Sequence, residues 1–459
     1  MNLVLLSGGS GKRLWPLSND ARSKQFLKVL EDDNKVSCSM VQRVFGQLKK
    51  TGLSQSTVIA TSKSQVEMLQ SQLDIETPLI VEPTRRDTFP AIALAAVYLY
   101  SERNTDLNDV VAVLPVDPYV EDDFFKKMKD LDSLLAETNA ELALIGVKPT
   151  YPSSKYGYIV PNKGGNTQNN YIQVASFTEK PTEEEAKLLI EQSALWNCGV
   201  FAFKLNYIIS KIKKLNLPLN YNELSSRFDE LPKISFDYEV VEKAKNIIAL
   251  PYEGYWKDLG TWNTLTEEMG TNQIGKGVIS EECKNVHVIN ELDIPVTVLG
   301  TSNLVIAASP DGILVSDKEA SPRIKELVGD FENRPMYEER RWGWYKILEY
   351  TKFKEGVETL TKRICIKKGE NLSYQQHFYR SEVWTVIKGS GEFVLNEELF
   401  QVNIGDVLQV PISARHAIRA ITDLELIEVQ CGSQLIEEDI IRLQTNWESI
   451  IDCCKIIKV

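Results

Sequence analysis

The first 26 residues combine glycines with cationic side chains in an order that suits phosphate binding. Residues 2–7 are mostly apolar, glycines follow at positions 8, 9 and 11, and cations follow the glycines. This order predicts a buried strand that opens onto a phosphate-binding turn. Glycine has no Cβ, so backbone N–H groups can approach an anion closely. Arg13 and Lys24 would then add charge-assisted hydrogen bonds to a polyphosphate.

Two common phosphate-binding motifs do not fit this stretch. A Walker A loop needs a glycine five residues before its Gly-Lys pair and a serine or threonine after it, but Leu6 and Arg13 occupy these positions. The dinucleotide fingerprint needs a third glycine where Leu14 stands. On the glycines alone, a turn without a ligand remains the alternative.

Two aspartates are candidates for holding Mg²⁺. Asp117 follows an apolar run at 109–114, where consecutive β-branched residues predict a strand buried on both faces, and Asp258 also ends a short strand. Open α/β sheets bind ligands at the carboxyl ends of their strands, and Mg²⁺ commonly takes one or two carboxylates with phosphate oxygens. An aspartate in such a place can also cap a turn or a helix, so the residue types leave both interpretations open.

Composition excludes several classes of function. The 459 residues include 64 acidic and 52 basic ones, and the formal net charge of −12 argues against a nucleic-acid scaffold. No segment reaches the roughly 18 apolar residues of a membrane span, and the apolar start lacks the basic leader of a signal peptide. The seven cysteines show no metal-type Cys-x-x-Cys spacing. We therefore expect a cytoplasmic protein without a nucleic-acid or membrane partner.

The pattern of apolar residues changes twice along the chain. Residues 1–265 alternate apolar runs with amphipathic segments, as an open α/β sheet does. Residues 266–340 contain short apolar runs broken by turn residues, which predicts a small β-rich connector. Residues 341–459 alternate apolar and polar positions with frequent glycine, as an antiparallel barrel does. A chain of this length has room for three such domains.

The run from Gly8 to Phe26 resembles the signature of the sugar-1-phosphate nucleotidyltransferases, in particular that of the mannose-1-phosphate guanylyltransferases. It reads Gly-Gly-Ser-Gly-Lys-Arg-Leu-Trp-Pro-Leu-Ser and then Lys-Gln-Phe, without a gap in the match. One departure is Asp87, which stands where asparagine is more usual. Further motifs follow in family order at 82–93, 114–117, 156–159, 177–181, 196–199 and 256–262.

This resemblance implies a Rossmann-like domain of the GT-A type, followed by a connector that is a partial left-handed β-helix in relatives. It implies that GTP and α-D-mannose 1-phosphate react to give GDP-mannose and diphosphate, for polysaccharide or glycan synthesis. Asp117 and Asp258 would bind Mg²⁺, with Arg13 and Lys24 as catalytic cations. A homodimer would also agree with the family. The implied substrate contacts are Leu6, Gly8, Gly9, Gly11, Lys12, Glu82, Arg86, Gly157, Glu179, Lys180 and Asn197.

The segment 369–416 resembles the paired motifs of cupin barrels, and also the phosphomannose isomerase domain that is fused to many guanylyltransferases. The cupin resemblance implies a Zn²⁺, Mn²⁺ or Fe²⁺ site whose N and O donors suit these ions. Val383 stands where isomerase-type sequences have histidine, and valine neither ligates a metal nor transfers protons. A metal-free barrel that serves packing or assembly is the alternative. The implied ligands are Gln375 (in place of the usual first histidine), His377, Glu382 and His416.

Three other functions are also compatible with these residues. The same transfer could use another sugar 1-phosphate or another base. A bifunctional enzyme could also interconvert mannose 6-phosphate and fructose 6-phosphate. A non-catalytic sensor of sugar nucleotides would usually lack a cation or a metal-binding aspartate, whereas this chain keeps Arg13, Lys24, Asp117, Lys180 and Asp258.

Overall fold

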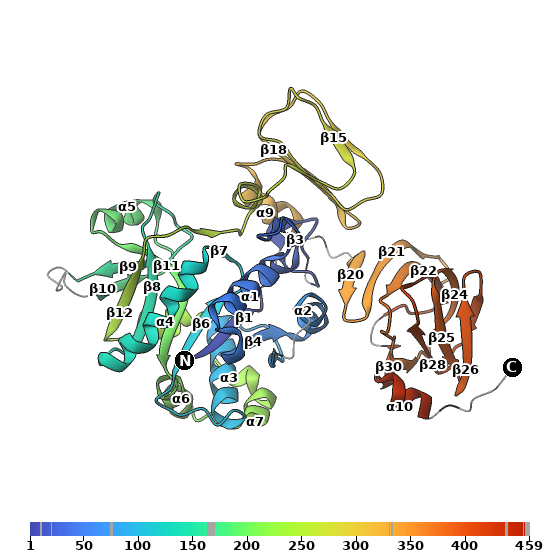
Figure 1. Cartoon of the computed structure of the whole chain (residues 1–459), viewed down its shortest axis with the longest axis horizontal. Helices are drawn as coiled ribbons and strands as arrows, with labels where there is room; N and C mark the ends of the chain where they lie inside the picture. Colours follow the sequence, from blue (N-terminus) through green and yellow to red (C-terminus); the bar gives the residue numbers. More distant parts are fainter. Residues whose placement is uncertain are drawn as a thin grey trace.

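The computed structural model of the chain contains an α/β part, a connector made mostly of strands, and a β-barrel (Figure 1). These parts follow one another along the sequence. No helix within the described ranges has the length and apolar character needed to cross a bilayer. The residues that the structure describes are 1–9, 12–19, 21–73, 77–162, 170–329, 331, 334–436, 439–452 and 454.

A nine-stranded sheet forms the centre of the α/β part. Its first four strands are parallel, and β11 runs antiparallel to both of its main neighbours, so that it joins the two halves of the sheet. In spatial order the strands are β5 (Leu79–Glu82), β4 (Thr57–Ser62), β1 (Asn2–Ser7), β6 (Val110–Pro115), β11 (Leu195–Lys204), β8 (Leu142–Val147), β12 (Ile247–Tyr252), β10 (Ile172–Thr178) and β9 (Tyr158–Pro161).

Helices cover both faces of this sheet, which explains why its central strands are apolar on both sides. Leu3 and Leu5 of β1 pack with α1 and α4, whereas Val4 packs with α3 and α6 on the other face. The prediction that the 109–114 run forms a doubly buried strand is thereby confirmed. The helices are α1 (Met40–Thr51), α2 (Val66–Leu73), α3 (Thr88–Ser101), α4 (Asp122–Glu137), α5 (Glu183–Glu191), α6 (Leu205–Lys214), α7 (Tyr221–Ser226) and α8 (Trp262–Thr266).

Two short antiparallel pairs lie beside the main sheet. One is the hairpin of β2 (Leu30–Glu31) and β3 (Ser37–Cys38). The other joins β7 (Pro118–Val120), which directly follows the end of β6, to β13 (Trp256–Asp258) from much later in the chain. This second pair brings two distant segments to the same edge of the sheet.

The connector consists of strands that pair in parallel with strands one turn later. One sheet runs β14-β16-β18 in parallel and ends with antiparallel β19, while β15 pairs in parallel with β17. The chain therefore alternates between two small sheets, as predicted for a β-helix-like connector. The elements are β14 (Gln273–Ile274), β15 (Gly277–Ile279), β16 (His287–Asn290), β17 (Val296–Val298), β18 (Leu304–Ser309), β19 (Gly312–Asp317), η7 (Ser321–Arg323) and α9 (Ile324–Val328).

The barrel is antiparallel, as its sequence pattern predicts, and Trp384 and Phe393 lie in its core. Its six-stranded sheet runs β20 (Tyr337–Arg340), β21 (Gly343–Lys352), β22 (Glu358–Ile366), β29 (Leu424–Gly432), β24 (Arg380–Lys388) and β27 (Val407–Val410). The five-stranded sheet runs β26 (Glu398–Asn403), β25 (Ser390–Leu395), β28 (His416–Ala420), β23 (Tyr374–Gln376) and β30 (Ile441–Gln444), and α10 (Trp447–Asp452) follows.

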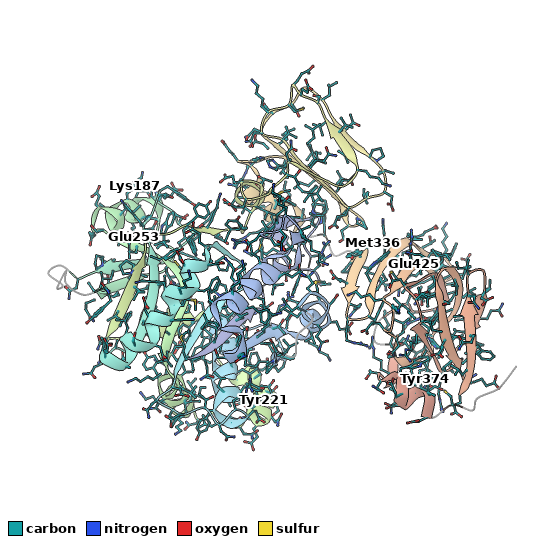
Figure 2. All side chains as sticks on the ribbon, viewed as in Figure 1. Lys187, Tyr221, Glu253, Met336, Tyr374 and Glu425 are labelled. Carbon is teal, nitrogen blue, oxygen red and sulfur yellow. The ribbon has the colours of Figure 1, made fainter. Side chains whose placement is uncertain are left out.

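The barrel meets the α/β part where β20 lies against α2. Glu339 of β20 accepts hydrogen bonds from Ser71 Oγ at 3.0 Å and from Gln72 Nε2 at 3.2 Å. Met336, labelled in Figure 2 at the entrance to the barrel, donates its N–H to Asp311 of the connector at 2.7 Å. The predicted limit at 340 would assign β20 to the connector, although β20 pairs with β21 of the barrel. The domain limits at 265 and 340 themselves stay predictions.

Candidate active site

Lys24 joins two aspartates at the carboxyl edge of the main sheet. Its Nζ lies 2.7 Å from Asp117 Oδ2 and 3.4 Å from Asp258 Oδ1. Asp117 stands between β6 and β7, and the register of β13 with β7 sets Asp258 opposite Pro118. Burial alone would lower the pKa of Lys24, but the two carboxylates outweigh this effect and raise it. The ammonium therefore stays charged and holds the carboxylates together.

The donor set of this site fits a magnesium ion. Asp117 and Asp258 both reach one point, the position of the Lys24 ammonium, and two carboxylates with phosphate oxygens and water satisfy Mg²⁺. The protein itself offers two acidic ligands here, so the remaining ligands would come from a phosphorylated substrate. Binding of the ion requires the ammonium to give way.

Three buried glutamines position the glycine turn and Lys24, and sequence reasoning missed two of them. Gln25 donates to Ser7 Oγ at 3.3 Å and to Gln65 Oε1 at 3.2 Å. Gln65 donates to Gly9 O at 3.2 Å, and Gln72 donates to Phe26 O at 3.0 Å. Gln65 and Gln72 lie outside the signature, in an ordinary helical segment, and no motif marks them.

The turn after β1 has the open backbone that its glycines predict, as far as the structure describes it. A Cβ added to Gly9 would have no atom within 4 Å. Gly11, also predicted to bind phosphate, lies outside the described residues. Lys12 points toward the connector, where its Nζ lies 3.5 Å from Gly329 O. Arg13 instead lines a pocket of about 750 Å³ that also borders Asp258.

A second pocket, of about 440 Å³, lies on the other side of the turn. A Cβ on Gly8 would lie 3.0 Å from Glu82 Oε1, so the glycine lets this carboxylate approach the backbone. Burial raises the pKa of Glu82 to about 7, and Arg85 offsets the rise only in part. Predicted site residues that line this pocket are Leu6, Gly8, Gly9, Lys24, Glu82, Arg86 and Asp117.

Arg86 and Asp87 shape one wall of that pocket. The Arg86 guanidinium donates to Leu231 O at 2.9 Å and pairs with Asp229 at 3.3 Å, so it also fastens two segments together. Asp87 has a φ of 73° and accepts a hydrogen bond from Thr88 N at 2.7 Å, which caps α3. With ψ at −176°, this backbone lies outside the left-handed helical region that asparagine and aspartate favour, so the conformation itself does not explain the residue type.

A polar cluster forms at the other end of the site. Asn197 N donates to Gly157 O at 2.8 Å, and Lys180 pairs with Glu179 at 2.8 Å. A Cβ on Gly157 would lie 2.5 Å from Glu179 Oε2, so only glycine leaves room for this carboxylate. Asn197 Nδ2 donates to Asp237 Oδ1 at 3.1 Å. The structure therefore brings the four residues predicted for sugar binding together.

Asp237 is a member of this cluster that the sequence did not reveal. It begins a short π-helix over Asp237–Val241, and such helices are frequent at functional sites. Burial and the nearby charge of Glu179 raise the pKa of Asp237 to about 7. It is an acidic residue in an amphipathic segment without a motif, so the sequence carried no signal for it.

In the barrel, Glu382 lies between the two predicted histidine ligands. Its carboxylate oxygens are 3.3 Å from His377 Nε2 and 3.5 Å from His416 Nε2, and Gln375 Nε2 lies 3.5 Å from His377 Nε2. Burial would raise the pKa of Glu382, but His416, His377 and Arg380 outweigh it and lower it. Within the described residues, His377, Glu382 and His416 form the one group of three metal-type ligands close enough to share an ion.

This cluster fits a transition metal. His416 Nδ1 lies 3.1 Å from Ala414 O and can donate to it, which leaves its buried Nε2 without a hydrogen-bond partner and free to ligate. Arg380 contacts the same atoms, because its Nε donates to Glu382 Oε1 at 3.0 Å and its Nη2 lies 3.3 Å from His377 Nε2. A metal would therefore require the Arg380 guanidinium to move.

Val383 lies on the opposite face of its strand from Glu382. Arg380, Glu382 and Trp384 point into the barrel and are buried, whereas Val383 is 39 % exposed and pairs with the equally exposed Val429. Valine at 383 therefore removes neither a ligand nor a proton carrier from the barrel site, because a side chain at this position does not face that site, and the expectation drawn from the motif is wrong here.

A pocket of about 460 Å³ opens from the barrel toward α2 of the α/β part. Glu67 of α2 lines it together with Gln375, Arg380 and Glu382 of the barrel. Lys362 and Glu428, which lie 3.5 Å apart, complete its charged wall. Glu382 is the member of the metal-type cluster that lines this pocket.

Two family models match the chain. The model of the nucleotidyl transferase family matches residues 2–273, and that of the mannose-6-phosphate isomerase C-terminal family matches residues 332–445. Together with the α/β fold and its charged edge, the first match defines a nucleotidyltransferase. The chain belongs to the nucleotidyl transferase family. The predicted GT-A-like fold with a C-terminal cupin barrel is confirmed.

Curated relatives cover nearly the whole chain. RfbM of Salmonella typhimurium, named mannose-1-phosphate guanylyltransferase, is 29 % identical, with 96 % of each chain covered. The alginate biosynthesis protein AlgA of Pseudomonas syringae pv. tomato is 30 % identical and covers 96 % of this chain and 95 % of its own. The xanthan biosynthesis protein XanB of Xanthomonas campestris pv. campestris is also 30 % identical, over 97 % and 98 %.

A solved structure matches most of the chain as well. It is a mannose-1-phosphate geranyltransferase, as it is named, from Thermus thermophilus. It is 26 % identical, with a TM-score of 0.59, and the match covers 72 % of this chain and 99 % of that one.

Proposed function

We propose that the protein is a mannose-1-phosphate guanylyltransferase, which converts GTP and α-D-mannose 1-phosphate to GDP-mannose and diphosphate. The observation that carries the proposal is the triad of Lys24, Asp117 and Asp258, which lies between the pocket beside Glu82 and the polar cluster around Asn197. The names of relatives that match the chain over nearly its full length support the choice of substrates.

The transfer needs positioning and charge neutralisation more than covalent chemistry. An oxygen of the sugar phosphate attacks the α-phosphorus of the nucleotide, and the bond from that phosphorus to the oxygen of the departing diphosphate breaks. Lys24 is charged beside Asp117 and Asp258, and its ammonium can donate to a phosphate oxygen. Arg13 lines the pocket on this side and stabilises the charge that develops on the diphosphate.

Asp117 and Asp258 would hold Mg²⁺ in this reaction. When bound, the ion would neutralise phosphate charge. The role of the two aspartates is to keep that charge beside the nucleotide, and β7 and β13 fix their relative position.

The pocket beside the glycine turn suits a guanine base. Guanine carries an exocyclic amino group as a donor, and the neighbouring ring N–H is a second donor on the same edge. The buried carboxyl of Glu82 can accept from both, which adenine cannot match. The pKa of Glu82 is raised to about 7 because burial leaves its charged form poorly stabilised. Hydrogen bonds from the two guanine donors would therefore stabilise the carboxylate.

The polar cluster suits the hexose. Glu179, Asn197 and Asp237 offer acceptors and donors for vicinal hydroxyls, and Lys180 would pair with the sugar phosphate. Gly157 lets the Glu179 carboxylate lie against the backbone of this cluster, since any Cβ there would collide with it.

The first test is diphosphate release with Mg²⁺, measured for four nucleoside triphosphates and a panel of sugar 1-phosphates. The proposal expects a maximum with GTP and mannose 1-phosphate, which Asp117→Ala removes. A maximum with another pair would reject the substrates but keep the reaction, and no release with any pair would reject both.

A second candidate activity is isomerisation of mannose 6-phosphate and fructose 6-phosphate in the barrel. The pocket of about 460 Å³ supports it, because cations, Glu382 of the metal-type cluster and a candidate base line it together. Burial and the charge of Glu382 raise the pKa of Glu428 to about 6, close to working pH for a base that moves a proton between carbons. Fructose 6-phosphate formation after loading with Zn²⁺, Mn²⁺ or Fe²⁺, and its loss in Glu428→Gln, would test this activity.

We also propose that the protein is cytoplasmic and forms a homodimer through the connector. β19 is an edge strand, and its Ile313 and Val315 are 59 % and 64 % exposed, so a second copy could cover an apolar strip. Light scattering of the wild type and of Ile313→Lys would distinguish a dimer that this substitution dissociates from a monomer.

A further inference from the structure

The pocket of about 750 Å³ that Arg13 and Asp258 line is shared between two parts of the chain. The α/β part supplies Arg13, Lys155, Lys180 and Asp258, and the connector supplies Lys325 from α9. None of the sequence motifs includes Lys325, because it lies in a stretch outside all of them. The connector is therefore one wall of the candidate active site.

The place of α9 against the glycine turn is fixed by several contacts. The helix packs on η1 (Lys12–Leu14), the short turn that carries Arg13, and Figure 1 shows α9 at the junction of connector and α/β part. Just after it, the rings of Phe331 and Trp15 meet edge to face at 5.7 Å. Just before it, Ser321 Oγ accepts a hydrogen bond from Asn263 N at 3.3 Å. These contacts on both sides fix α9, and with it Lys325, at the pocket that Arg13 also lines.

The pocket carries an excess of positive charge. Its acidic members are Asp258, which is engaged with Lys24, and Glu326. Lys180 is paired with Glu179. The side chains of the other three cations make no hydrogen bond or ion pair with any residue in the described part of the chain, and these are Arg13, Lys155 and Lys325. An anion with several negative oxygens would complement such a set.

We propose that Lys325 binds the terminal phosphates of the nucleoside triphosphate and the diphosphate that leaves. Lys325 and Arg13 line the same pocket, and the helix α9 that carries Lys325 packs on η1, which carries Arg13. The inference rests on the proposed function, because it assumes a nucleotidyl transfer that releases diphosphate. It does not depend on which base or which sugar the enzyme uses. It gives the connector a direct part in substrate binding.

The test is binding of magnesium diphosphate to the full-length protein by calorimetry, with Lys325→Ala, Lys325→Arg and the control Lys284→Ala. Lys284 is an exposed lysine of the connector that does not line the pocket. Loss of one charge-assisted hydrogen bond predicts about tenfold weaker binding for Lys325→Ala, partial recovery with arginine, and no change in the control. Thermal unfolding should stay unchanged, since Lys325 is exposed.

Steady-state kinetics then distinguishes an effect on triphosphate binding from an effect on sugar 1-phosphate binding. The KM for the nucleoside triphosphate should rise about tenfold in Lys325→Ala, while the KM for the sugar 1-phosphate stays at the wild-type value. The inference would be overturned if Lys325→Ala bound diphosphate as tightly as the control variant does, or if only its KM for the sugar 1-phosphate rose. If no substrate pair reacts, the proposed function fails, but the calorimetric comparison still decides the role of Lys325.

Discussion

The ammonium of Lys24 lies 2.7 Å from Asp117, and it also contacts Asp258, so it occupies the point that both carboxylates could offer to a divalent cation. Lys24→Gln should therefore have two opposite effects. Turnover should fall by about two to three orders of magnitude, because a cation aimed at the reacting phosphates is lost. The affinity for Mg²⁺ should rise several-fold, because the competing charge is gone.

Both effects can be measured by kinetics and by titration with Mg²⁺. Lys187→Gln is the matched control, since Lys187 is exposed on α5 and lines none of the site pockets (Figure 2). Weaker Mg²⁺ binding in Lys24→Gln would show that the ammonium supports the carboxylates rather than competing with the ion.

Gln65→Leu should destabilise the fold and impair nucleotide binding together. Gln65 is fully buried, and it bridges Gly9 O and Ser23 Oγ while accepting from Gln25. An apolar side chain of similar size would leave these partners unpaired, at a cost of about 1–3 kcal/mol in the free energy of unfolding. Urea denaturation gives the first quantity and the KM for the triphosphate gives the second.

The comparison for this prediction is Gln55→Leu, at an exposed glutamine of the same part of the chain. If Gln65→Leu unfolds with the same midpoint as this control, the glutamine network is not what holds the turn.

Asp237→Asn should change how stability depends on pH. The pKa of Asp237 is about 7 in the folded protein against 3.8 as the ordinary value, so the folded state binds this proton more tightly. The stabilisation of the folded state by this bound proton is complete below about pH 4, and it is lost as the pH rises to about 7. Asparagine removes this loss, so the variant should gain roughly 1 kcal/mol or more over the wild type between these pH values.

Thermal unfolding of both proteins at pH 4.5, 6 and 8 measures the effect. A difference between variant and wild type that stays constant over this range would mean that the carboxyl titrates normally. The KM for the sugar 1-phosphate should rise in the same variant, because an acceptor for a hydroxyl is replaced.

Val383→His should leave the barrel site as it is. The side chain at 383 is on the outer face beside Val429, so a histidine there cannot reach Glu382 or the ring of His416. His416→Ala should instead reduce bound transition metal from about one ion per chain to nearly none. Metal content by plasma mass spectrometry compares the two variants after purification with Zn²⁺ in the buffers.

Two outcomes would contradict this prediction. A gain of metal or of isomerase activity in Val383→His would place residue 383 inside the site. Equal metal content in His416→Ala and the wild type would remove the cluster as a binding site.

Much of the fold and part of the site could be predicted from the sequence, for identifiable reasons. The doubly buried strand 109–114 is visible because both faces of a central parallel strand must be apolar. The residues Lys24, Asp117 and Asp258 are predictable because motifs contain them, and the structure does place them in contact. Their roles stay proposals.

What the sequence could not reveal depends on contacts between distant segments. Gln65 and Gln72 matter because they reach the glycine turn and Phe26, which no local pattern encodes. Lys325 matters only because α9 folds back onto η1. The case of Val383 is different, since the alternation along its strand already indicates a face opposite to that of Glu382, although the motif alone suggests an inward position.

The pairing of β7 with β13 has a consequence for how the site could be lost or altered. The ribbon contains three residue pairs, and its register alone determines that Asp258 stands beside Asp117. A slip by a single residue would turn Asp258 to the other face of the ribbon while leaving every motif intact. One residue inserted before Trp256, outside the motif at 256–262, could thus silence the centre as fully as deleting the carboxylate, although a motif search would still report an active enzyme.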